Sequence, residues 1–149
     1  MVIAGLIMKI QKLSSNQYDQ AIELLSGNQL PTEDLHAGHI ELFGYWENDN
    51  LMGCIGIERF ENLGLLRSLV VDSRLRGKGM GAQLVNYLEE MCIKNGVTDL
   101  FLLTETAEVF FANRDYLRID RSKTPQPLLA SAEFSHLCPD SAVLMVKKL

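Results

Sequence analysis

Apolar residues change their spacing several times along the chain, and each spacing predicts a type of element. In the first half, alternating or continuous apolar segments between turn residues predict strands at residues 8–13, 41–47, 51–60 and 65–71. Helices are expected from Ser14 or Ser15 to about Leu25 and over residues 30–35, where polar caps or a proline precede apolar positions. The three strands after residue 40 should form an antiparallel meander, because only short turns connect them.

After residue 79 the spacing becomes helical. The apolar positions that carry this spacing are Met80, Leu84, Val85, Leu88, Met91 and Cys92. A near-continuous apolar segment at 99–104 predicts a buried parallel strand, which makes a right-handed βαβ unit with strand 65–71 and this helix. The elements expected in the last third are helices at 107–113 and 129–137 and strands at 118–121 and 141–148. The pattern predicts a mixed α/β fold in one domain spanning residues 1–149.

Composition narrows the class of protein. Apolar residues make up 47% and charged residues 22% of the 149 positions, close to the average of globular proteins. The net charge of −5 argues against nucleic-acid binding, and no apolar segment is long enough for a membrane span. The three cysteines are far apart and lack the spacing of a zinc site, so we expect reduced thiols, a cytoplasmic protein and no metal.

The segment RGKGMG, residues 76–81, places three glycines between strand 65–71 and the helix. Glycine costs backbone entropy on folding, so this density indicates that a ligand approaches the backbone closely. Backbone N–H groups at such a turn, together with a helix N-terminus, bind phosphate. The spacing fits neither the GxGxxG of a dinucleotide fold nor a P-loop, because Gly79 follows Lys78 where a P-loop has Ser or Thr.

RGKGMG matches the R/Q-x-x-G-x-G/A acyl-CoA signature of the GNAT superfamily of N-acetyltransferases. The surrounding segments LRSLVVDSRLRGKGMGAQLV, DLFLLT and AEVFFANRDY follow the order of that superfamily. LLRSLVV, LFLLTETAEVFF and EFSHLCPDSAVLM more narrowly resemble the arsenic-resistance N-acetyltransferases, which are similar to the acetyltransferase domain of N-acetylglutamate synthases. The resemblance implies a GNAT fold, with a mixed sheet splayed between its two parallel central strands and flanked by helices.

The resemblance also implies acetyl-CoA as co-substrate and direct acetyl transfer to an amine. Gly-rich amides would hold the pyrophosphate, Arg76 and Lys78 would add positive charge, and the pantetheine would pair with the edge of strand 65–71. The Leu69 N–H is the expected donor to the developing oxyanion. The expected cofactor-binding residues are Leu69, Val70, Val71, Arg76, Gly77, Lys78, Gly79, Met80, Gly81 and Phe111.

Glu58 and Arg67 are the expected acceptor-site residues. If residues 62–63 form the hairpin loop, Glu58 stands directly opposite Arg67 on one face of the sheet. Arg67 would bind a carboxylate or another anion of the acceptor, and Glu58 would orient Arg67 or accept the proton of the amine. The alternative is a surface ion pair. Thr104, at the end of a parallel strand, is expected to hydrogen-bond the acceptor.

One departure from the superfamily keeps other functions open. Phe111 occupies the position of the tyrosine that often protonates the leaving thiolate, and Tyr45 or water would have to replace it. We expect an N-acetyltransferase for a small amino-acid-like amine, with arsenic resistance as one role. The alternatives are a non-catalytic acyl-CoA-binding module and a protein N-acetyltransferase. Either a monomer or a homodimer is compatible with the sequence, and Cys138 is a candidate to line the acceptor site.

Overall fold

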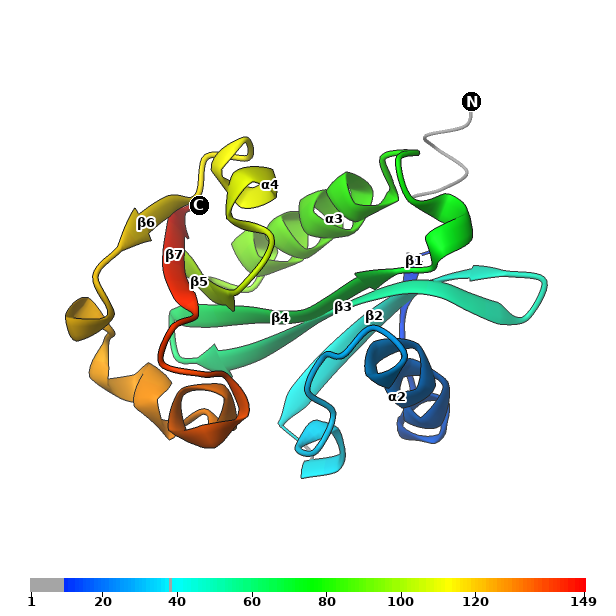
Figure 1. The fold of residues 1–149 in the computed structure, drawn as a ribbon, viewed down its shortest axis with the longest axis horizontal. Helices are drawn as coiled ribbons and strands as arrows, with labels where there is room; N and C mark the ends of the chain where they lie inside the picture. Colours follow the sequence, from blue (N-terminus) through cyan, green and yellow to red (C-terminus); the bar gives the residue numbers. More distant parts are fainter. Residues whose placement is uncertain (1–9, 38) are drawn as a thin grey trace.

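A single seven-stranded mixed sheet organises the computed structural model, which describes residues 10–37 and 39–149 (Figure 1). The strand order is β1-β2-β3-β4-β5-β7-β6, and only the central pair β4 and β5 is parallel. The strands are β1 Ile10–Lys12, β2 Ile40–Glu47, β3 Asn50–Phe60, β4 Leu63–Val71, β5 Asp99–Thr104, β6 Leu117–Ile119 and β7 Val143–Lys148. This confirms the mixed α/β fold and the meander followed by a βαβ unit. The first two residues of the expected strand 8–13 lie outside the described residues.

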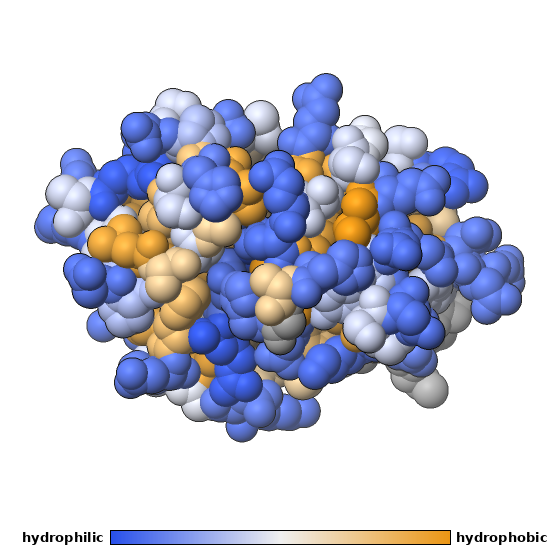
Figure 2. Space-filling model, turned by 90° about the horizontal axis from the view of Figure 1, so that it is seen from below, coloured by the Kyte–Doolittle hydropathy of each residue, from blue (hydrophilic) through white to orange (hydrophobic). Residues whose placement is uncertain are grey.

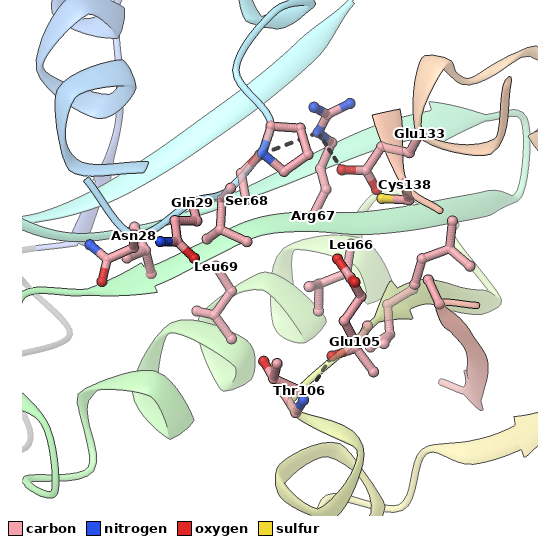
Figure 3. Close-up of a pocket in the computed structure, with 18 of the residues that line it drawn as sticks. Asn28, Gln29, Leu66, Arg67, Ser68, Leu69, Glu105, Thr106, Glu133 and Cys138 are labelled. Atoms are coloured by element: carbon pink, nitrogen blue, oxygen red, sulfur yellow. Dashed lines mark hydrogen bonds and ion pairs between the residues drawn. The ribbon is translucent and has the colours of Figure 1, made fainter. Parts of the chain in front are cut away.

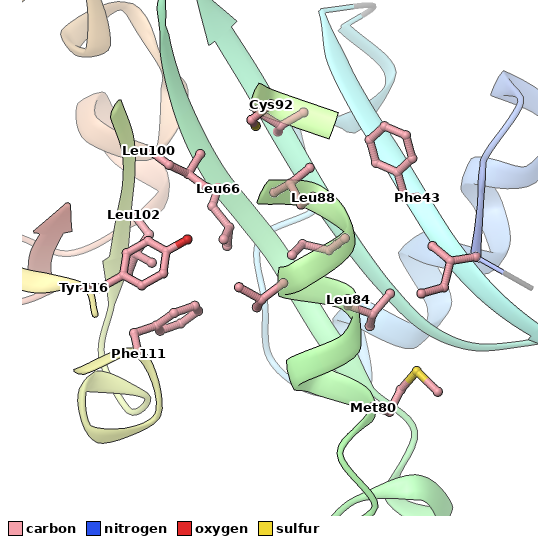
Figure 4. Packing of buried hydrophobic residues seen from close by; sticks show 14 of the residues in the cluster. Phe43, Leu66, Met80, Leu84, Leu88, Cys92, Leu100, Leu102, Phe111 and Tyr116 are labelled. Atoms are coloured by element: carbon pink, nitrogen blue, oxygen red, sulfur yellow. The ribbon is translucent and has the colours of Figure 1, made fainter. Parts of the chain in front are cut away.

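Helices cover both faces of this sheet. The helices are α2 Tyr18–Ser26, α3 Met80–Lys94 and α4 Glu108–Ala112. Alternation along the strands directs Phe43 toward the α3 side, where it shares a core with Leu84 and Leu88 (Figure 4). The neighbouring Leu42 is directed toward α2. The helical spacing after residue 79 thus identified the face of α3 that packs on the sheet.

No helix within the described ranges is long and apolar enough to cross a membrane.

The surface seen from the α2 side is mostly hydrophilic (Figure 2). Apolar atoms show between the polar side chains mainly toward the end that carries β6. The exposed large apolar residues of the described chain are Ile93, Val109, Leu117 and Leu129. They belong to different elements, as isolated apolar residues on protein surfaces commonly do.

The expected register of the β3–β4 hairpin is wrong by two residues. Phe60 pairs with Leu63, so the turn lies at residues 61–62 rather than 62–63. Glu61 adopts the left-handed conformation that closes this tight turn, with φ of 60°. Glu58 consequently pairs with Leu65 instead of Arg67. A shift of two residues preserves the face on which each side chain lies, so Glu58 and Arg67 still share one face.

Two expected helices form differently. In the segment 30–35, only a 3₁₀ turn at Leu35–Ala37 follows an open loop. Asp34 in this loop binds Arg67 of β4 through both carboxylate oxygens, a contact that holds the segment against the sheet. The expected helix 129–137 is divided into a 3₁₀ helix, Gln126–Ala130, and a π-helical turn, Glu133–Leu137.

The two parallel central strands separate halfway along β4. Their pairing joins residues 63–66 to residues 99–102 and then stops, although β4 continues to Val71. Just past this point Ser68 has a φ of 59°, and the register between β3 and β4 shifts between Cys54 and Gly56. Within the part of the chain that the structure describes, this bulge leaves the β5 side of β4 without a pairing strand from residue 67 onward. The splay expected from the resemblance is therefore present.

Replacing Ser68 with valine should destabilise the protein, because a β-branched residue is strongly disfavoured at positive φ. We expect Ser68→Val to lower the free energy of unfolding by about 1–3 kcal/mol and Ser68→Gly to change it by less than about 1 kcal/mol. Urea unfolding of both variants measures the difference. Equal stability of the two variants would show that the backbone at residue 68 is not constrained as described.

Candidate active site

A cavity of about 740 Å³ lies where β4 and β5 separate (Figure 3). Residues 66–71 of β4 form one wall, and residues 102–107, from the end of β5 to the start of α4, form another. The loop after α2, the segment from Glu133 to Ala142, and the side chains of Arg76 and Phe111 provide the remaining lining residues. Ligands bind preferentially at the carboxyl ends of strands where a sheet opens, so the splay accounts for the position of the cavity.

The exposed edge of β4 runs along this cavity. Leu69, Val70 and Val71 all line it, and on this side β4 has no strand partner because β5 has already diverged. Val70 packs its side chain toward α2, whereas Leu69 and Val71 pack toward the α3 side and are half-buried. The backbone N–H and C=O groups of this segment are placed to bind an extended ligand that carries amide groups.

The glycine loop continues from the Val71 end of that edge. Gly77 and Gly79 have φ of 79° and 80°, and a Cβ atom at either position would meet nothing within 4 Å. Glycine is therefore required here by the backbone conformation and not by crowding. Gly79 precedes α3, and among residues 10–37 and 39–149 no side chain caps the helix. The free N–H groups of the first turn make this end of α3 an anion-binding position.

The other residues expected at the loop have distinct environments. The Met80 side chain is buried in the core, so only its backbone faces a ligand, and Gly81 packs near Phe110. Arg76 lines the cavity, donates from Nε to the Val71 carbonyl at 3.2 Å, and contacts Asn28 Oδ1 through Nη2. Arg76 thereby links the end of β4 to the loop after α2. Lys78 is exposed.

Arg67 is buried at the other end of the β4 wall, and three carboxylates surround its guanidinium. Asp34 accepts from Nη1 at 2.7 Å and from Nη2 at 2.6 Å, and Glu58 Oε1 accepts from Nη1 at 2.7 Å. Glu133 Oε2 lies 3.6 Å from Nε, and Ser68 Oγ accepts from Nε at 3.3 Å. Burial by itself lowers the pKa of Arg67, but these carboxylates outweigh burial and raise that pKa above its ordinary value.

This arrangement differs from the expected one. We expected a guanidinium available to an acceptor anion, and the structure instead pairs Arg67 with carboxylates of the same chain. Glu58 is 1% exposed and is not among the residues that line the cavity. Its Oε1 accepts from Arg67 and from Ser131 Oγ at 2.6 Å, and its Oε2 lies 3.2 Å from His39 Nε2. These contacts hold Glu58 against Arg67, behind the cavity wall.

Glu133 was missed by the sequence analysis. It lies in the π-helical turn, is 5% exposed, and lines the cavity beside Cys138 (Figure 3). Burial raises the pKa of Glu133 to about 7, with Arg67 opposing the shift and Glu58 and Asp34 adding to it. The sequence offers one weak signal, the glutamate that begins the segment EFSHLCP. A glutamate in a predicted helix is more typical of a solvent-exposed position, so this signal does not predict a buried carboxylate.

The remaining candidates divide between the cavity and the core. Thr104 lines the cavity, and its Oγ1 accepts from the Ala107 N–H at 2.9 Å, so the hydroxyl hydrogen is free to donate to a ligand. Phe111 lines the cavity from the core, where its ring packs edge to face on Tyr116 with the ring centroids 5.3 Å apart (Figure 4).

Two tyrosines bind carboxylates away from the cavity. The Tyr116 hydroxyl donates to Glu89 at 2.8 Å, and the Tyr45 hydroxyl donates to Glu47 at 2.7 Å. Within the described chain, no tyrosine lines the cavity.

One group of side chains has the composition of a metal site. Possible ligand atoms of Asp34, His39 and Glu58 lie within 4.8 Å of one another. Both carboxylates already bind the Arg67 guanidinium, whose positive charge opposes a cation at the same position. We therefore assign no metal to this group.

Comparison with known proteins identifies a family. The model of the "Acetyltransferase (GNAT) family" matches residues 9–118. An uncharacterized N-acetyltransferase of Chlorobaculum tepidum is 33% identical over 79 residues, a match that spans 52% of this chain and only half of that relative.

Solved structures share the fold at low sequence identity. An acetyltransferase of the GNAT family from Staphylococcus aureus Mu50 superimposes with a TM-score of 0.78 at 18% identity, covering 94% of this chain and 98% of that one. N-acetylglutamate synthase from Neisseria gonorrhoeae, complexed with coenzyme A and N-acetyl-glutamate, gives 0.75 at 16% identity, covering 94% of this chain and 35% of that one. An aminoglycoside 6'-N-acetyltransferase complexed with coenzyme A gives 0.71 at 18% identity, covering 93% and 96%.

The raised pKa of Glu133 should make stability depend on pH. The folded-state pKa of about 7 exceeds that of an unfolded glutamate, so the stability conferred by the protonated carboxyl is lost as pH rises toward 7. Glu133→Gln removes this titration. Only the wild type then loses this stability as pH rises. We therefore expect the free energy of unfolding of Glu133→Gln, minus that of wild type, to increase by about 2 kcal/mol from pH 5 to pH 7. Urea unfolding across this range measures it, and parallel curves for the two proteins would contradict the assigned environment.

Proposed function

This chain belongs to the acetyltransferase (GNAT) family, and we propose that it transfers the acetyl group of acetyl-CoA directly to the primary amine of a small acceptor. The observation that carries the proposal is the continuity between three features. They are the uncapped start of α3, the unpaired strand edge at Leu69–Val71, and the cavity. The strand edge begins near the start of α3 and runs along the cavity toward the end that contains an ionisable group. A long ligand with phosphates at one end and an acyl group at the other fits this order.

The residues present fit acetyl-CoA. In the proposed complex, the first-turn amides of α3 and the loop around Gly77 and Gly79 bind the pyrophosphate, with charge from Lys78. The pantetheine amides pair with the free edge of β4, as an added strand would. Phe111 and the apolar side chains of the cavity pack against the arm. Acetyl-CoA supplies a thioester whose carbonyl carbon is open to attack by an amine.

The chain supplies a donor for the transition state. We assign the Leu69 N–H to the developing oxyanion, because Leu69 lies on the unpaired part of β4 and lines the cavity. The leaving thiol has an ordinary pKa of about 8.5, so the thiolate leaves without an obligatory acid. Phe111 in place of a tyrosine is thus compatible with catalysis, and the match to the acetyltransferase family favours an enzyme over a module that only binds acyl-CoA.

The finer proposal is an amino-acid-like acceptor with a role in arsenic resistance. It is supported by the resemblance of LLRSLVV and EFSHLCPDSAVLM to arsenic-resistance N-acetyltransferases. The contacts of Arg67 set a condition on it, because an acceptor carboxylate must compete with Asp34 for the guanidinium. A second candidate, transfer to the N-terminus or a lysine of a protein, is favoured by the acidic lining residues Glu33, Glu105 and Glu133.

The acceptor class can be tested by measuring amide formation from acetyl-CoA. Release of the free thiol gives the rate, and mass spectrometry identifies the amide. The panel pairs amino acids with their carboxamides and adds arsenical and phosphorus amino-acid analogues, polyamines and a lysine peptide. We expect turnover of at least one small amine, and preference for free carboxylates would favour the amino-acid-like acceptor. Turnover of the peptide alone would favour the second candidate. Acetyl-CoA binding without any amide product would contradict an enzyme.

The glycine loop offers a matched pair of variants. Gly79 and Gly96 flank α3 with φ of 80° and 81°, and a Cβ atom at either position would meet nothing within 4 Å. Alanine should strain both backbones equally, but only Gly79 lies in the proposed phosphate loop. By calorimetry we expect Gly79→Ala to weaken acetyl-CoA binding at least tenfold and Gly96→Ala to leave it unchanged. Equal affinities would argue against this loop as the phosphate site.

A further inference from the structure

An amine acceptor presents a proton that must leave before transfer. Aliphatic amines are mostly protonated near neutral pH, and an ammonium nitrogen has no lone pair with which to attack a thioester. A general base at the Arg67 end of the cavity, where the acceptor binds in the proposed complex, would remove this proton. Three carboxylates meet there, those of Asp34, Glu58 and Glu133, and each contacts Arg67.

Hydrogen bonding distinguishes these three carboxylates. Asp34 uses both oxygens to accept from Arg67. Glu58 accepts from Arg67 and Ser131 and lies behind the wall. Glu133 alone of the three lines the cavity, and within the described chain its carboxylate accepts no hydrogen bond, with Arg67 Nε at 3.6 Å. Glu133 is thus the one of these three carboxylates that lines the cavity with oxygens not already engaged in hydrogen bonds.

The surroundings hold Glu133 in this position. Its N–H donates to Ser131 Oγ at 3.2 Å, and the same hydroxyl donates to Glu58 Oε1 at 2.6 Å. Its carbonyl accepts from the Cys138 N–H at 3.0 Å, which closes the π-helical turn. Single π-helical turns are frequent at functional sites because they redirect one side chain. In Figure 3 the Glu133 side chain points toward Arg67, with Cys138 beside it.

We infer that Glu133 is the general base of the transfer, accepting the proton of the acceptor ammonium. The inference rests on the proposed function and adds the residue that the sequence analysis did not find. The charged and titratable groups that face Glu133 are Arg67 on β4, Glu58 on β3, Asp34 in the loop after α2, and the Cys138 thiol. Burial raises the pKa of the Glu133 carboxyl, Arg67 opposes that shift, and the two other carboxylates add to it.

The ammonium nitrogen gives one proton to the Glu133 carboxylate, and the freed lone pair forms a bond to the thioester carbonyl carbon. The carbon–sulfur bond then breaks, the nitrogen loses its second proton, and the thiolate takes up one proton. Glu133 returns its proton to solvent. The sum is ammonium plus acetyl-CoA giving amide, coenzyme A thiol and one proton. The near-neutral pKa of Glu133 suits this exchange.

The experiment compares Glu133→Gln with Glu90→Gln, which alters an exposed glutamate of α3 outside the cavity. For an amine that the wild-type protein acetylates, kcat/KM is measured from pH 5.5 to 10, with the Kd of acetyl-CoA. We expect the wild type and Glu90→Gln to show an acidic limb near pH 7. Glu133→Gln should lose about 100-fold or more in kcat/KM at pH 7 and lack that limb, with acetyl-CoA affinity unchanged.

Two further readouts separate a base from a structural residue. Raising the pH toward 10 supplies free amine, so the deficit of Glu133→Gln should shrink there, and Glu133→Asp should recover part of the activity. An unchanged pH profile in Glu133→Gln, or a loss of acetyl-CoA binding equal to the loss of rate, would overturn the role of Glu133 and leave the acetyltransferase intact. A wild-type protein that forms no amide would overturn the proposed function and this role together.

Discussion

The buried guanidinium of Arg67 is the interaction around which the site is arranged. A charge with a fully buried side chain is tolerated only when it is paired and hydrogen-bonded, and the partners here come from separate parts of the chain. Asp34 ties down the loop after α2, Glu58 comes from the neighbouring strand, and Glu133 comes from the π-helical turn. Satisfying one cation thus draws both loops that border the cavity onto β4.

The splay of the sheet depends on the residues next to that cation. Ser68, adjacent to Arg67, carries the left-handed φ at which β4 bulges, and the parallel pairing with β5 ends just before it. The bulge leaves the edge from residue 67 to Val71 unpaired, which gives the cavity a wall of free backbone groups.

The two ends of this wall have opposite electrostatic character. At the Val71 end, the uncapped start of α3 and Arg76 provide positive potential. At the Arg67 end, three carboxylates outnumber one guanidinium. A ligand with phosphates at one end, reacting at the other with a positively charged amine, matches this polarity along the strand.

The sequence by itself determined most of the elements and the glycine turn before α3, because these depend on local spacing: the helical repeat of α3, the apolar segment of β5, and the glycines at 77 and 79. It also determined that Glu58 and Arg67 share a face, since a two-residue error in register preserves alternation. Only the tertiary structure decided what Arg67 contacts and that Glu133 reaches the cavity. Those contacts join residues far apart, as Ser131 and Glu58 do across 73 positions, and they depend on burial and charge balance that no local pattern encodes.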